Sequence, residues 1–149
     1  MRKLLPGRST RQRLRRKRLA SFASSRPEIA AVLLFGSHGT PWETPLSDVD
    51  LAVLFDPGFQ ADPGVLLALE GALLEEAGLA EGSAVNLNAA PVLLQHRVLQ
   101  EGRLVYLRDP VVLADFAESV FRRHGDFVED HRRFLADFDG TLRERYGGA

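Results

Sequence analysis

Residues 34–54 read LFGSHGTPWETPLSDVDLAVL and contain the ends of two apolar segments with a polar, glycine- and proline-containing segment between them. An apolar run over residues 29–35 leads into Gly36 and Ser37, and a second apolar run begins around Asp48 and Asp50. Each run has the length of one strand, and glycine and proline residues are frequent between them, as in a connecting loop. We therefore expect two strands joined by a loop, with polar residues where the first ends and the second begins.

These polar residues carry the chemistry. Side chains alternate along a strand, so Asp48 and Asp50 are expected on one face, where two carboxylates can share divalent cations such as Mg²⁺ bound to substrate phosphates. Gly36 lets the backbone approach a phosphate closely, and Ser37 offers a hydroxyl and a backbone N–H. Either fragment alone also fits an ordinary turn or a solvated loop. Together they have the donors that phosphoryl or nucleotidyl transfer requires.

The rest of the chain alternates between helical and strand patterns. We expect a helix from Pro63 that ends at Gly78, a short strand over 84–88, a helix from Pro91 to Gly102 and a strand over 103–107. Residues 110–145 are helical throughout, and Gly125 and Gly140 interrupt them, so one long helix and two helices both fit. The predicted fold class is α/β (α+β), a small mixed sheet of about four strands with flanking helices and a C-terminal helical appendix.

Length and composition exclude several classes of protein. The chain has 149 residues, 45% of them hydrophobic, which suits one domain with a buried core. It contains no cysteine, so there is no disulfide framework, no thiolate zinc site and no thiol nucleophile. No apolar run approaches the roughly 20 residues of a transmembrane helix, so no membrane partner is expected. The histidines lack HExxH or paired ligand spacing, which argues against zinc; they are His38, His96, His124 and His131.

Charge is distributed unevenly along the chain. Residues 1–18 hold nine of the 19 basic residues and none of the 20 acidic ones, so the remainder carries a net charge of −10. The favoured interpretation is an amphipathic first helix, with Leu14, Leu19 and Phe22 packing and Arg11, Arg15 and Arg18 in water. A nucleic-acid contact and an organellar transit peptide are the alternatives. The expected division is a basic arm over 1–24, a core over 25–109 and C-terminal helices over 110–149 that pack on the core or a partner.

The Gly-Ser pair, ten intervening residues and the Asp-Val-Asp triplet resemble the signature of the nucleotidyltransferase superfamily, whose fold is that of the catalytic region of DNA polymerase β. The resemblance spans residues 31–109. Within it, LNAAP at 87–91, EGRLVY at 101–106 and Arg108-Asp109 are similar to the small prokaryotic minimal nucleotidyltransferases, and more narrowly to MntA-type antitoxins that pair with HEPN-domain toxins.

The resemblance implies a function and a set of site residues. Such proteins transfer AMP from ATP, with Mg²⁺, to a tyrosine of the partner toxin, which is thereby neutralised in the cytoplasm. Asp48 and Asp50 would be the catalytic and metal-binding residues, and Gly36 and Ser37 would bind the nucleotide. The alternatives are a catalytically impaired nucleotide-binding antitoxin that occludes its toxin and a nucleic-acid-binding regulator that uses the basic arm. A homodimer is a further alternative for the assembly.

Two positions depart from the family pattern. The second glycine expected five residues after Gly36 is replaced by Pro41, and Gly39 is the nearest substitute. The third metal-binding carboxylate is missing, since no Asp or Glu occurs from residue 82 to 100, and the matching positions are Ser83 or Asn86. A neutral oxygen ligand brings no charge, so we expect slow transfer, or nucleotide binding without turnover.

Five of the nine phenylalanines lie in the C-terminal helical stretch: Phe116, Phe121, Phe127, Phe134 and Phe138. An unbroken helix of this length would extend beyond a sheet of four short strands. The sequence therefore predicts either a hairpin bent at Gly125 or a docking surface for another chain.

Overall fold

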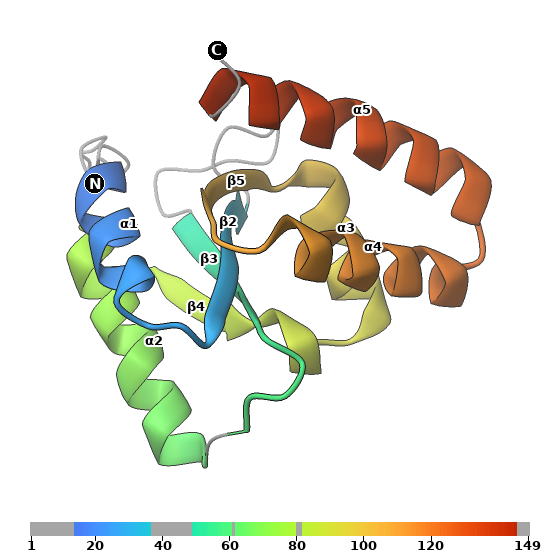
Figure 1. The fold of residues 1–149 in the computed structure, drawn as a ribbon. Helices are drawn as coiled ribbons and strands as arrows, with labels where there is room; N and C mark the ends of the chain where they lie inside the picture. The colour runs from blue at the N-terminus through green and yellow to red at the C-terminus, as the bar shows by residue number, and fades with distance from the viewer. Residues whose placement is uncertain (1–13, 37–48, 61, 80–81, 146–149) are drawn as a thin grey trace, which may run out of the picture.

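The computed structural model describes residues 14–36, 49–60, 62–79 and 82–145, with side chains to residue 138 in the last helix. Within these residues a single four-stranded sheet has helices on both faces (Figure 1). The elements in chain order are α1 (Arg16–Ser24), β2 (Ile29–Gly36), β3 (Val49–Phe55), α2 (Pro63–Ala77), β4 (Ser83–Asn86), the 3₁₀ turn η2 (Leu87–Ala89), α3 (Val92–Glu101), β5 (Arg103–Leu107), α4 (Pro110–His124) and α5 (Phe127–Arg145).

The sheet is mixed, with strand order β4-β3-β2-β5. Strand β2 lies between β3 and β5 and is antiparallel to both, whereas β3 and β4 are parallel. Antiparallel neighbours need only a loop between them, but the parallel pair needs a crossover, which α2 provides between β3 and β4. The predicted small mixed sheet of about four strands with flanking helices is confirmed.

Two cores sandwich the sheet. Within β2, Val32 belongs to the core on the α1 and α2 side, whereas the next residue, Leu33, belongs to the core on the side of α3, α4 and α5. Figure 1 shows these two groups of helices on opposite sides of the sheet. Because both faces are covered, the strand is a continuous apolar run and does not alternate with polar residues. This double coverage explains why residues 29–35 could be recognised as one buried strand from the sequence.

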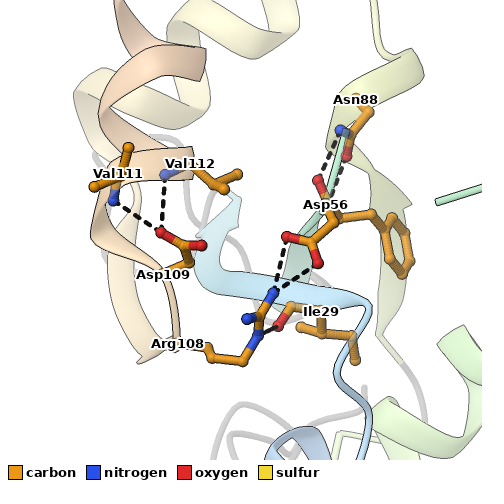
Figure 2. A network of polar contacts seen from close by, with 8 residues as sticks. Ile29, Asp56, Asn88, Arg108, Asp109, Val111 and Val112 are labelled. Carbon is orange, nitrogen blue, oxygen red and sulfur yellow. Dashed lines mark hydrogen bonds and ion pairs between the residues drawn. The ribbon is translucent and has the colours of Figure 1, made fainter. Parts of the chain in front are cut away.

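Local capping sets the ends of α2 and α4. The side chain of Asp62 accepts a hydrogen bond from the backbone N–H of Val65 at 2.9 Å, and Pro63 follows in the first turn. Gly78 closes α2 with a φ of 78°, in the left-handed region that favours glycine. Asp109 accepts hydrogen bonds in the same way at the start of α4 (Figure 2).

The basic first helix follows the favoured interpretation where it is described. Leu19 is buried, and Leu14 and Phe22 pack partly against the α2 side of the core. Arg15 and Arg18 are exposed, and Arg18 contacts Glu76 of α2 at 3.3 Å. Arg11 lies outside the described residues. None of the described helices combines the length and the apolar character that crossing a bilayer demands.

The C-terminal stretch is a hairpin of two helices. Gly125, with a φ of 104°, ends α4, and α5 folds back against it. Phe121 and Phe134 are buried, with ring centroids 5.7 Å apart, and Phe138 stacks on Phe134 at 5.3 Å. The predicted bend at Gly125 is therefore observed, and docking of another chain on these helices stays a prediction. Phe121 and Phe134 are buried in the core of this chain.

A polar network joins the ends of β2, β3 and β5 (Figure 2). Arg108 donates to both carboxylate oxygens of Asp56, at 2.8 and 2.9 Å, and to the carbonyl of Ile29 at 3.0 Å. The amide of Asn88 accepts from the backbone N–H of Phe55 at 2.8 Å and donates to its carbonyl at 3.0 Å. Asn88 and Arg108, which carry part of the family resemblance, thus connect the elements at the end of the sheet where β3 ends.

Candidate functional site

The glycine and the second aspartate of the sequence motif lie on adjacent strands at one end of the sheet. Gly36 is the last residue of β2 and pairs with Val49, the first residue of β3. Asp50 is therefore one residue inside β3, opposite Phe35 of β2. This end of β3 is the opposite end from the network at Phe55, about 16 Å away at 3.3 Å per residue. Gly36 and Asp50 are thus diagonal neighbours on adjacent strands, at the same end of the sheet.

Gly36 has a φ of 130°, which L side chains rarely adopt. A Cβ atom here would be strained by the backbone conformation alone, so the position requires glycine for a conformational reason. Ser37, Asp48, Gly39 and Pro41 lie outside the described residues, so their predicted roles remain predictions.

Strand register places Ser83 beside Asp50. The two residues are partners in the parallel β3–β4 pair, and the Ser83 hydroxyl donates to Oδ1 of Asp50 at 2.5 Å. Asn86 pairs with Val53, which lies three residues after Asp50 on β3. Because side chains alternate between the faces of a strand, Asn86 points to the face opposite Asp50. Its side-chain oxygen accepts from the backbone N–H of Asn88 at 3.1 Å and caps η2. Of the two positions left open by the sequence, Ser83 is the neighbour of the acid.

The short strand also differs from its predicted range. The sequence predicted a strand over 84–88, but β4 ends at Asn86 and residues 87–89 turn in η2. The side chain of Asn86 stabilises this turn, which competes locally with a further strand residue. The shift starts the strand at Ser83 and so brings the hydroxyl into register with Asp50.

Asp50 lies on the face of the sheet that α3, α4 and α5 cover. Side chains two residues apart on a strand share a face, so Asp50 lies on the same face as Ala52 and Leu54. These two residues belong to the core beneath those helices. Unlike these two residues, Asp50 is only half-buried, because it lies at the end of the sheet. The Asp50 carboxylate and the Ser83 hydroxyl, both at the end of the sheet, are hard oxygen donors of the kind that Mg²⁺ prefers. The donor set therefore fits a magnesium ion that retains water or phosphate ligands.

Comparisons with known proteins agree with this geometry. The family model described as "Polymerase beta, Nucleotidyltransferase" matches residues 17–111, and no curated protein matches the chain. A chain of a toxin–antitoxin complex crystallised with AMP-PNP is similar, at 17% identity over 90% of this chain and 94% of that one, with a TM-score of 0.51.

Two structures of MntA–HpeT toxin–antitoxin variants are also similar. One has two aspartates, two positions apart, replaced by glutamate, and matches at 15% identity over 90% of this chain and 94% of that one, with a TM-score of 0.50. The other has a tyrosine replaced by alanine and matches at 20% identity over 78% of this chain and 90% of that one, with a TM-score of 0.52. At these identities the likeness concerns the fold. The family match runs from α1 to the start of α4 and includes Gly36, Asp50 and Ser83, and the chain belongs to the polymerase beta nucleotidyltransferase family.

Proposed function

We propose that this protein is a minimal nucleotidyltransferase that transfers AMP from ATP to a protein acceptor, a HEPN-type toxin that it neutralises. The observation that carries the proposal is the position of Asp50 at the start of β3, where it accepts a hydrogen bond from Ser83 and lies near Gly36, the last residue of β2. The family match covers all three of these residues, which supports the proposal.

Each motif residue has a role in the proposed reaction. Asp48 and Asp50 would hold Mg²⁺, which neutralises the triphosphate and aligns nucleophile and leaving group when bound. Gly36 has no side chain and a positive φ, so its backbone would be accessible to a phosphate, and Ser37 would add a hydroxyl donor. Ser83 orients the Asp50 carboxylate through its hydrogen bond. In the transfer, the acceptor hydroxyl would lose its proton to solvent and its oxygen would bond to the α-phosphorus. The bond from the α-phosphorus to the bridging oxygen would break, and pyrophosphate would leave.

The proposed acceptor is a protein. Its support is the similarity to chains of toxin–antitoxin complexes, one of them crystallised with AMP-PNP. The direct test mixes the purified protein with a HEPN toxin encoded next to it and with ATP labelled at the α-phosphate. Label in the toxin together with released pyrophosphate supports transfer. Inhibition of the toxin without any label supports the alternative, an impaired antitoxin that acts by occlusion.

Ser83→Asp is expected to strengthen Mg²⁺ binding at the site. A carboxylate in place of the hydroxyl adds a negative charge beside Asp50, and about 1.4 kcal/mol of extra attraction for the ion suffices for a tenfold effect. The Mg²⁺ concentration that gives half-maximal transfer should therefore fall by about tenfold. Asn86→Asp is the matched control, because it adds the same charge on the other face of the same strand. An equal response from both variants would contradict the placement of the metal beside Ser83.

The outer face of α5 is the proposed contact for the toxin. Val128 and Leu135 are exposed apolar residues two turns apart, on one side of the helix, whereas the phenylalanines beneath them pack inward. We expect Val128→Asp with Leu135→Asp to stay folded and to weaken the toxin complex by about tenfold or more, since losing a hot-spot residue costs about 2 kcal/mol or more. Leu67→Asp on α2, where the leucine is also exposed, should leave the complex intact. Unchanged binding by the double variant would place the contact elsewhere.

A further inference from the structure

Three side chains that are far apart in the sequence meet beside the turn of the C-terminal hairpin. They are His96 of α3, His124 at the end of α4 and Asp130 near the start of α5. Nε2 of His96 lies 2.7 Å from Oδ2 of Asp130, and Nδ1 of His124 lies 3.4 Å from the same oxygen. The two imidazole rings stack with centroids 3.5 Å apart. One carboxylate oxygen therefore faces two imidazole nitrogens.

The cluster is buried more deeply than charged groups usually are. The side chain of Asp130 is 5% exposed, that of His96 10% and that of His124 28%. Nδ1 of His124 is itself buried and makes no hydrogen bond within the described structure. Such a nitrogen loses its water without gaining a partner, which is unfavourable. A cation that accepts the lone pair of Nδ1 and shares the carboxylate would satisfy both groups.

We propose that His96, His124 and Asp130 bind a divalent transition-metal ion, with Zn²⁺ the best match. Two imidazole nitrogens and a carboxylate oxygen form a typical zinc donor set, which leaves the fourth position to water. The three ligand atoms lie within 4.8 Å of one another, compared with about 3.3 Å between ligands of a tetrahedral zinc ion with bonds of about 2.0 Å. The rings must turn out of their stack, and the partly exposed His124 has the room to move.

This metal site is independent of the proposed magnesium site. Its ligands come from helices, and none of them belongs to the Gly-Ser or Asp-Val-Asp motif. Imidazole also favours Zn²⁺ over Mg²⁺, which prefers oxygen ligands. Because its ligands belong to α3, α4 and α5, the ion would fasten the hairpin to the helix beside it. The expected consequence is a gain in stability that does not depend on nucleotide.

The experiment uses the full chain without a histidine tag, treated with a chelator and then titrated at pH 7.5 with Zn²⁺ or Co²⁺ alone. We expect one equivalent to bind, Co²⁺ to show the visible absorption of a tetrahedral site, and the unfolding midpoint to rise by about 5 °C or more at a hundredfold excess over Kd. His124→Gln should abolish all three effects, and it keeps the contact between His96 and Asp130, so the fold is preserved.

Two controls locate the ion. His131→Gln, next to Asp130 but with its ring stacked on Phe127, should bind Zn²⁺ like the wild type. Asp50→Asn should also bind Zn²⁺ like the wild type, because Asp50 lies in β3 and is not one of the three proposed zinc ligands. The proposal is overturned if the wild type binds no Zn²⁺ at micromolar concentration, if His124→Gln binds it equally well, or if only Asp50→Asn loses it.

Discussion

Asp50→Asn is expected to lower AMP transfer by about a thousandfold and to leave the fold intact. The loss follows from the proposed role of Asp50, because the neutral amide would remove a charge that is proposed to hold Mg²⁺ against the triphosphate, and losing one such electrostatic group costs about 10² to 10³ in rate. The fold should survive because Asn has the same shape and its amide oxygen can still accept from the Ser83 hydroxyl. Asp48→Asn is expected to have a loss of similar size.

Rates of label transfer from ATP to the toxin at saturating Mg²⁺, together with a thermal melt of each variant, measure these effects. Asp56→Asn is the matched control, since it makes the same change just beyond the other end of β3, where the carboxylate pairs with Arg108 (Figure 2). It should lower the melting temperature and leave the rate per folded molecule unchanged. Transfer by Asp50→Asn within a factor of three of the wild type would refute the assigned site.

Gly102→Ala is expected to destabilise the protein by about 2 kcal/mol, within the usual range for overpacking. Gly102 joins α3 to β5, and its N–H donates to the carbonyl of Val98 at 2.7 Å. A Cβ atom added here would lie 2.5 Å from the same carbonyl oxygen and 3.4 Å from that of Leu34, so backbone must shift. The φ of −73° is ordinary, and the cost is therefore a collision and not a strained conformation.

Gly71→Ala is the control for this substitution. Gly71 lies inside α2, and a Cβ atom there would meet nothing within 4 Å. Alanine should raise stability by about 0.5–1 kcal/mol through its better helix propensity. Urea unfolding followed by circular dichroism compares the two variants. A Gly102→Ala protein as stable as the wild type would mean that the α3–β5 junction relaxes without cost.

Several features could be predicted because their causes are local. The limits of α2 follow from Asp62 with Pro63 at one end and Gly78 at the other, and the break at Gly125 follows from a glycine that adopts a positive φ. Strand β2 could be predicted because helices cover both faces of the sheet, so all of its residues are apolar and form one continuous run. The spacing of the Gly-Ser and Asp-Val-Asp motifs likewise predicted that Asp50 lies near the start of β3. Ser37 and Asp48 lie outside the described residues.

Other features depend on which segments come together across the fold. The choice of Ser83 over Asn86 depends on the register of the parallel pair β3–β4, where a shift of one residue would reverse the face of each side chain. The grouping of His96, His124 and Asp130 depends on how three helices pack, which their sequence spacing does not reveal. Local chemistry thus sets where helices and strands begin and end, because capping and periodicity act within a few residues. Long-range packing alone sets which side chains meet, because the contacts that choose the register and the helix faces join residues far apart in the chain.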